Sequence, residues 1–179
     1  MPSRREAHAD PALAGPRPPV PGPVVHVGYA LSRRGIPAVS SFRRWVAAAL
    51  AGACHDGPGE LSIRIVGSRE GRELNRRYRG RDYATNVLSF PAELPPGVGS
   101  PLLGDIVIAA PVVAREAREQ AKPVRDHYAH LAVHGVLHLL GYDHQREREA
   151  ARMEALETRT LASLGIANPY LEKTGNGAA

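Results

Sequence analysis

One short stretch, residues 134–144, constrains this chain more than any other. Its sequence is His-Gly-Val-Leu-His-Leu-Leu-Gly-Tyr-Asp-His. Residues four apart on a helix lie on the same face one turn apart, so His134 and His138 can direct their imidazoles at one atom between them. Gly141 favours the left-handed conformation that ends a helix, and the turn after it can bring His144 back toward the pair. The stretch therefore predicts a metal site on one helix and the turn that follows.

The residue types indicate what such a site does. Three neutral imidazoles leave one position of a tetrahedral ion open, and a zinc-like ion about 2.1 Å from its ligands lowers the pKa of a water there to about 7. We therefore expect a hydrolytic site. Imidazole suits Zn²⁺, Ni²⁺ and Co²⁺ alike, so the spacing does not choose among them. His130 lies four residues before His134, but it diverges from the pair on a straight helix, so we expect it at the surface or behind a ligand.

The same histidine spacing occurs in one class of zinc protease, where a glutamate directly after the first histidine is the general base. Gly135 occupies that position here, so peptide hydrolysis lacks its usual proton acceptor. Asp143 either assists a water, orients a histidine, or only helps to end the helix turn. The sequence leaves the general base open.

Hydrophobic periodicity predicts four strands and about five helices. The strands are expected at 24–27, 61–65, 87–90 and 105–109. The helices are expected from a cap at Ser40 or Ser41 to about Gly52, then over 68–78, 111–122, 125–140 and 147–164. These elements neither alternate strictly nor segregate, which predicts a single α+β domain with a small mixed four-stranded sheet and the metal site on a central helix. We expect the alternating Glu and Arg residues of the last helix on a solvated face.

The ends of the chain differ in composition from its middle. Residues 1–23 hold seven of the 16 prolines, so we expect them to be disordered, the alternative being a basic arm that touches nucleic acid. Residues 24–170 are the expected domain, and residues 171–179 a flexible tail. No apolar run suits a signal sequence or a membrane span. Because Cys54 has no partner for a disulfide, a cytoplasmic location is the simplest.

Arginine dominates the segment before the third strand. Six arginines, between residues 69 and 82, face three acidic residues there, a surplus that suits a phosphate backbone because guanidinium groups pair with phosphate oxygens at two points. The whole chain, however, favours arginine over lysine, so basicity alone equally fits an ordinary surface. Arg79 is expected in a loop beyond the helix 68–78, where it either clamps a scissile phosphate or is a plain surface arginine.

Four motifs resemble the YbeY family of bacterial endoribonucleases over about 24–170. They are Leu74-Asn75-x-x-Tyr78-Arg79, the segment Thr85 to Pro91, the segment Leu103 to Ile108, and the histidine stretch. The resemblance implies a metal-dependent, single-strand-specific endoribonuclease acting in ribosomal RNA maturation, notably at the 16S rRNA 3′ end, and in ribosome quality control. It also implies His134, His138 and His144 as ligands of Zn²⁺ or a similar ion, and Arg79 as a functional arginine near the site.

Three hypotheses follow for function. The first is the metal-dependent endoribonuclease, with single-stranded ribosomal RNA as substrate and the ribosome or small-subunit proteins as further partners. The second is a non-catalytic RNA-binding assembly factor whose metal is structural. The third is a metalloprotease-like hydrolase, which needs a carboxylate near the ion from elsewhere in the fold. The sequence leaves open whether water or the RNA 2′-hydroxyl attacks, and it leaves the oligomeric state unknown.

Overall fold

The structure, a computed structural model, describes residues 22–171 apart from residue 96. This part of the chain forms four strands and five helices in the order β1, α1, β2, α2, β3, β4, α3, α4, α5. The predicted α+β domain with one mixed sheet is confirmed. The expected disordered segment and flexible tail lie, but for residues 22, 23 and 171, outside the described residues.

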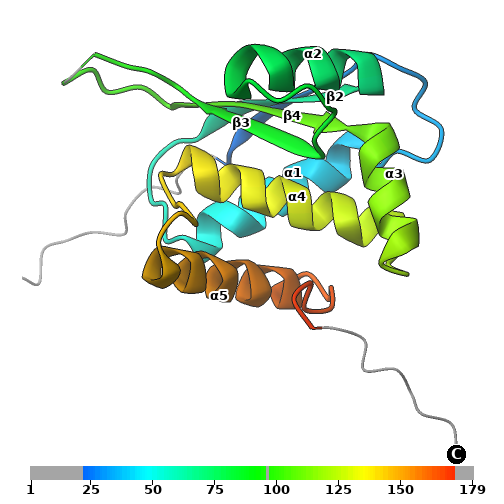
Figure 1. The fold of residues 1–179 in the computed structure, drawn as a ribbon. Helices are drawn as coiled ribbons and strands as arrows, with labels where there is room; N and C mark the ends of the chain where they lie inside the picture. Colours follow the sequence, from blue (N-terminus) through cyan, green and yellow to red (C-terminus); the bar gives the residue numbers. More distant parts are fainter. Residues whose placement is uncertain (1–21, 96, 172–179) are drawn as a thin grey trace, which may run out of the picture.

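The strands form one sheet in the order β1-β2-β4-β3. The strands β1 (Val24–Tyr29), β2 (Glu60–Val66) and β4 (Leu102–Ala109) run parallel, and β3 (Val87–Pro91) pairs with β4 in the antiparallel sense. The strand β3 therefore forms one edge of the sheet, as the ribbon in Figure 1 shows.

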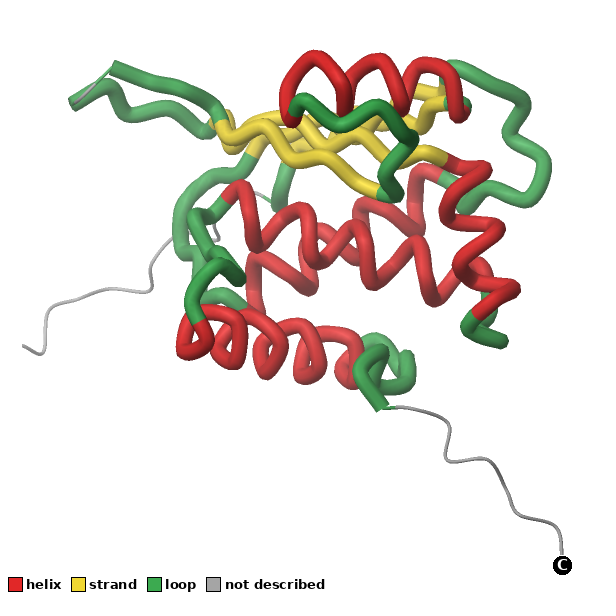
Figure 2. The backbone as a smooth tube through the Cα atoms, viewed as in Figure 1, coloured by secondary structure: helices red, strands yellow, loops and turns green. Residues whose placement is uncertain are grey.

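Helices cover both faces of the sheet. The helix α2 (Ser68–Arg79) lies on one face, while α1 (Val39–Gly52) and α4 (Val124–Leu139) lie on the other, with α5 (Glu147–Ser163) beyond them (Figures 1 and 2). The helix α3 (Ala110–Glu119) packs at the end of β4. A large core fills the α1/α4 side, where Phe42, Trp45 and Tyr128 have almost no exposed surface, and a smaller core lies under α2.

The helix α4 is the central helix of the domain. From His127 to Leu139 nearly all of its residues are buried, because it packs against the sheet on one side and against α1 and α5 on others. A helix enclosed in this way needs apolar residues around most of its circumference, and its sequence supplies them. The few partly exposed positions on α4, among them His134 and His138, are therefore the ones that can serve a site.

One predicted helix start is wrong. The helix α1 begins at Val39, so neither Ser40 nor Ser41 is its N-cap, and no side chain in the described part of the chain caps it. Ala38 is extended, and its carbonyl accepts hydrogen bonds from the backbone N–H of Ser41 and Phe42, so the backbone closes the first turn unaided. The other predicted boundaries lie within three residues of the observed ones. None of the described helices is long and apolar enough to cross a membrane.

Candidate metal centre

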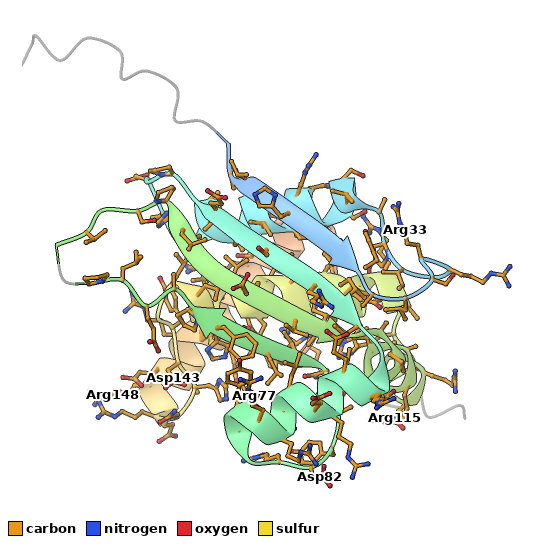
Figure 3. The ribbon with its side chains drawn as sticks, turned by 90° about the horizontal axis from the view of Figure 1, so that it is seen from above. Arg33, Arg77, Asp82, Arg115, Asp143 and Arg148 are labelled. Atoms are coloured by element: carbon orange, nitrogen blue, oxygen red, sulfur yellow. The ribbon has the colours of Figure 1, made fainter. Side chains whose placement is uncertain are left out.

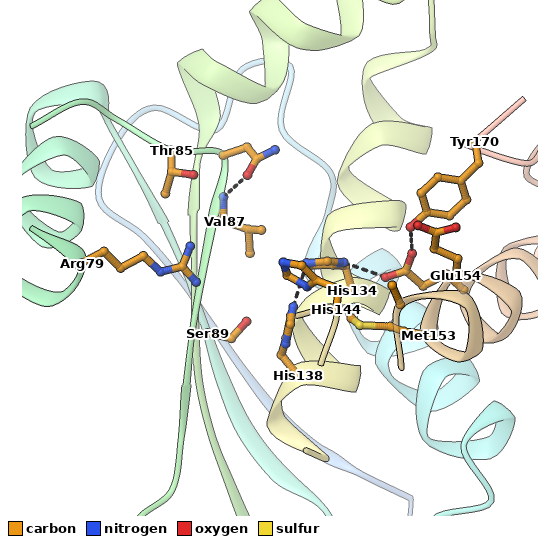
Figure 4. Close-up of a pocket in the computed structure, with 13 residues that line it drawn as sticks. Arg79, Thr85, Val87, Ser89, His134, His138, His144, Met153, Glu154 and Tyr170 are labelled. Atoms are coloured by element: carbon orange, nitrogen blue, oxygen red, sulfur yellow. Dashed lines mark hydrogen bonds and ion pairs between the residues drawn. The ribbon is translucent and has the colours of Figure 1, made fainter. Parts of the chain in front are cut away.

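His134 and His138 lie one turn apart on α4, on the side of the helix that faces β3 and α5 (Figure 4). Their Nε2 atoms are 3.0 Å apart, and the ring centroids are 4.5 Å apart. Two ligands of a tetrahedral ion at about 2.1 Å stand about 3.4 Å from each other. The observed separation is close to that value, so a small adjustment of the rings admits an ion between them.

The turn after α4 brings the third histidine to the pair. Gly141 has a φ of +87°, and the N–H of Tyr142 donates to the Leu137 carbonyl at 3.0 Å, the pattern that closes many helices. Asp143 then accepts a hydrogen bond from the backbone N–H of His144 at 2.7 Å. Asp143 thus stabilises the turn, the most ordinary of the roles considered for it.

The three imidazoles converge as the spacing predicts. The His144 ring centroid lies 5.0 Å from that of His138 and 5.8 Å from that of His134. One nitrogen from each ring falls within 4.8 Å of the others. His134 and His138 are partly buried and His144 is exposed, so the group is open to solvent on one side. Three imidazole nitrogen donors with an open side fit a zinc-like ion with one exchangeable position.

A buried glutamate on α5 forms a hydrogen bond with the Nδ1 side of the His134 ring. Glu157 on α5 has no exposed surface, and its Oε1 lies 2.6 Å from His134 Nδ1. Because a carboxylate accepts, Nδ1 carries the proton and Nε2 presents its lone pair to the other histidines. Tyr170 donates its hydroxyl proton to Glu157 Oε2, and His130 Nε2 lies 3.4 Å from that oxygen. His130 therefore lies beside the carboxylate that contacts the candidate ligand His134.

The charge state of this cluster follows from its surroundings. Burial, with the neighbouring His134 and His144, lowers the pKa of His138 to about 4, so this ring is neutral and able to bind a cation at neutral pH. Burial alone would raise the pKa of Glu157, but His130, His134 and Tyr170 outweigh it and hold that pKa at about 2. Burial and Glu157 raise the pKa of Tyr170, which keeps its proton. Glu157 is therefore a fixed negative charge beneath His134.

A cavity of about 420 Å³ opens over the histidines. Its walls come from β3 and the segment before it, from α4 and the turn after it, and from α5. Arg79 also lines it, although α2 lies on the opposite face of the sheet (Figures 1 and 4). The Arg79 guanidinium must therefore reach past the edge strand β3, and within the described residues no carboxylate pairs with it.

Two details of the sequence interpretation are wrong here. Arg79 is the last residue of α2 rather than part of a loop, because the left-handed Gly80 ends the helix one residue later. Glu157 is buried rather than solvated, although most charged residues of α5 are exposed. Its position carried a signal, since Glu157 lies four residues after Met153 and four before Leu161, in the apolar stripe of the helix.

The other arginines of the 69–81 segment do not share one surface. Arg72 forms a two-point ion pair with Asp82, Arg77 lies over the Tyr78 ring, and Arg81 donates to the Tyr83 hydroxyl. In Figure 3, Arg77 on α2 and Asp82, which follows the helix in the chain, lie at separate places. Only Arg79 and Arg81 line cavities that the metal-site histidines also line. This segment therefore contributes to the candidate site through the positions of Arg79 and Arg81, and not through its total of six arginines.

Gly135 packs against Ile106 of β4, on a face of α4 that adjoins the one carrying the histidines. A Cβ atom at this position would lie 2.9 Å from Ile106 Cδ1 of β4, closer than carbon atoms approach each other. A glutamate at residue 135 would enter the core instead of the metal site. The close packing of α4 on the sheet therefore explains the glycine and removes the zinc-protease base.

Comparisons with known proteins agree with this geometry. Residues 36–165 match the sequence model of a family described as Endoribonuclease YbeY. The chain is 65% identical over 140 residues to a protein of that name from Alkalilimnicola ehrlichii, covering 77% of this chain and 84% of that protein. It is 62% identical over 156 residues to one from Stenotrophomonas maltophilia, covering 83% and 96%. The solution structure of TM1509 from Thermotoga maritima shares the fold with a TM-score of 0.51 at 23% identity, covering 87% of this chain and 100% of that one.

Proposed function

This chain belongs to the YbeY family of endoribonucleases, and from that premise we propose that it cuts single-stranded RNA at the metal centre described above. In this proposal His134, His138 and His144 hold a divalent ion, Zn²⁺ being the first choice, and Arg79 binds the scissile phosphate. The activity is that of a hydrolytic endoribonuclease in ribosomal RNA processing. The finer assignment, to maturation of the 16S rRNA 3′ end and to ribosome quality control, is part of the proposal.

One observation carries it: the three imidazoles and the guanidinium of Arg79 line the same cavity from opposite sides. An RNA phosphodiester carries a negative charge that grows on its oxygens during cleavage, so it needs positive groups on more than one side. A cavity with histidine ligands on one wall and a guanidinium on the other offers this arrangement.

In this proposal the metal ion, Glu157 and Arg79 have separate roles. When bound, the ion supplies Lewis acidity, which draws charge from a phosphate oxygen and acidifies a water. Glu157 keeps the proton of His134 on Nδ1 and so keeps Nε2 free to bind. Arg79 forms paired hydrogen bonds to the phosphate and fixes its orientation.

The partners and location follow from the substrate. We propose ribosomal RNA as the natural target, with the ribosome or small-subunit proteins as further partners, and the cytoplasm as the place of action. Residues 24–170 form the proposed catalytic domain. The free cysteine, Cys54, is exposed, and such a thiol persists in a reducing compartment.

The test is cleavage of a labelled single-stranded rRNA fragment by the purified full-length chain. We expect cleavage by metal-loaded protein, loss after chelation, and recovery when Zn²⁺ is returned. His134→Ala should abolish cleavage and lower the bound metal, measured by elemental analysis. A matched control is His26→Ala, since His26 is an exposed histidine on β1 that contacts only Glu60 among the described side chains.

The outcomes distinguish the three hypotheses. A correctly folded, metal-loaded protein that binds the RNA without cutting it would favour the assembly factor with a structural metal. Proteolysis of a denatured protein substrate would favour the metalloprotease. Equal cleavage by wild type and His134→Ala would remove the histidine centre from the reaction.

A further inference from the structure

The backbone hydrogen-bond donors along the free edge of β3, beside the candidate metal centre, are unevenly distributed. In an antiparallel pair, alternate residues direct their N–H and C=O groups to the partner strand, and the residues between them direct theirs outward. Asn86 accepts from the Ala109 N–H at 2.9 Å, and Ala92 donates to the Leu103 carbonyl at 2.9 Å. The even-numbered residues therefore bond to β4, and Val87, Ser89 and Pro91 present their backbone groups to the free edge.

Two of these three outward positions offer no donor. The Val87 N–H donates to the side-chain oxygen of its neighbour Asn86 at 2.7 Å. Asn86 is itself fixed, because its amide donates to Glu116 at 3.0 Å, and Glu116 lies 2.8 Å from the buried His127. Pro91 has no N–H. Along this edge Ser89 alone, among the described residues of β3, is left with a free outward N–H.

The side chain of Ser89 adds a second donor at the same place. Ser89 and Val87 line the cavity that holds the histidines, and Figure 4 shows the Ser89 hydroxyl between Arg79 and His138. The wall formed by Arg79, Thr85, Asn86, Val87 and Ser89 contains no carboxylate, whereas Glu154 and Glu157 lie on the α5 wall. The β3 wall therefore attracts an anion, and the α5 wall does not.

We propose that Ser89 forms a phosphate subsite of the RNA-binding cavity: its backbone N–H and its hydroxyl donate to a non-bridging phosphate oxygen, while Arg79 pairs with the same phosphate. This inference rests on the proposed function and deepens it by assigning the group that recognises the substrate backbone. The same edge suits a peptide poorly, because an added strand needs alternating N–H and C=O partners. Here the N–H of Val87 already donates to Asn86, and Pro91 has no N–H.

The decisive variant is Ser89→Pro. Proline removes the outward N–H and the hydroxyl together, and an edge strand tolerates it where the N–H faces solvent. Binding of a short single-stranded 2′-O-methyl RNA to the metal-loaded full chain is measured by fluorescence anisotropy, and cleavage is measured with unmodified RNA. We expect binding to weaken at least tenfold, since each hydrogen bond to a charged group is worth about tenfold or more, and cleavage to slow by at least as much. Ser89→Ala keeps the N–H and should lose less.

A second pair covers the case in which Ser89→Pro does not fold, which circular dichroism would reveal. Ser89→Asp and Ser89→Asn are nearly equal in size and differ in charge, so repulsion of the phosphate should make the aspartate variant bind at least tenfold more weakly than the asparagine variant. Wild-type affinity in a folded Ser89→Pro protein would overturn the subsite, and where that variant does not fold, equal affinity of the aspartate and asparagine variants would overturn it. If wild type binds RNA without cutting it, the proposed function fails while the binding results still decide the subsite. If wild type does not bind RNA, both fail.

Discussion

The hydrogen bond between Glu157 and His134 leads to a quantitative prediction about the affinity of the site for a metal ion. A cation on Nε2 draws electron density from the imidazole, so the Nδ1–H becomes a stronger donor and its bond to a carboxylate strengthens when metal binds. Glu157 is buried and holds its charge at neutral pH because its pKa is about 2. The carboxylate therefore stabilises the metal-bound state more than the metal-free state.

The substitution Glu157→Gln keeps the shape and an acceptor for Nδ1 but removes the charge. A hydrogen bond to a charged group contributes about 1.5–3 kcal/mol and a neutral one about 0.5–1.5 kcal/mol, so the change costs about 1–1.5 kcal/mol. At about 1.4 kcal/mol per factor of ten, metal binding should weaken about tenfold. Substitution of groups that orient metal-binding histidines generally costs about 10–100-fold, which agrees with this value.

The assay is competition for Zn²⁺ between the protein and a chromophoric chelator of known affinity. The matched control is Glu149→Gln on the same helix, because Glu149 is exposed and its nearest charged partner is Arg146 at 3.7 Å. Urea unfolding of the metal-free proteins separates metal affinity from fold stability. Wild-type affinity in a folded Glu157→Gln protein would refute the orienting role and leave Glu157 as a structural buried charge.

Other substitutions test the charge, the turn and the helix packing at this site. Arg79→Ala should lower the cleavage rate about 10²-fold, with Arg79→Lys intermediate because lysine lacks the forked pairing, in single-turnover assays with Arg69→Ala as control. Gly141→Ala should cost about 1–2 kcal/mol of unfolding free energy, since φ is +87° there, and should weaken Zn²⁺ binding by displacing His144. Gly135→Glu should lose about 3–5 kcal/mol in urea unfolding, because an unpaired carboxylate enters the core, while Gly135→Ala should lose less. A Gly135→Glu protein of unchanged stability would contradict the packing argument.

The sequence predicted the fold and the histidine geometry because both depend on local patterns. Apolar residues at periods of two and of three to four define the elements, and their order limits the class of fold. The candidate metal site lies within residues 134–144, where one helix and one glycine turn determine how the side chains converge. The failed prediction of the α1 cap is also local: two serines near the start of a helix do not reveal that the backbone of Ala38 already closes its first turn.

The parts that the sequence missed come from distant segments. Glu157 is 23 residues from His134, and only the packing of α5 on α4 brings it beneath the imidazole. The charge of Glu157 favoured an exposed side chain, while its place in an apolar stripe favoured a buried one. Without the tertiary contact with His134, neither signal decides between the two. Arg79 reaches the cavity only because β3 is the edge of the sheet, which depends on the strand order.

The same strand order links the chemistry of the two cavity walls. The histidines of α4 line a cavity whose facing wall includes the edge strand β3. That edge presents the Ser89 N–H and hydroxyl together with Arg79, and it lacks the regular backbone partners that a peptide strand requires. In the proposed subsite, a histidine arrangement shared with proteases is thus combined with a wall that suits phosphate, and the strand beside the candidate metal centre, rather than the centre itself, selects the class of substrate.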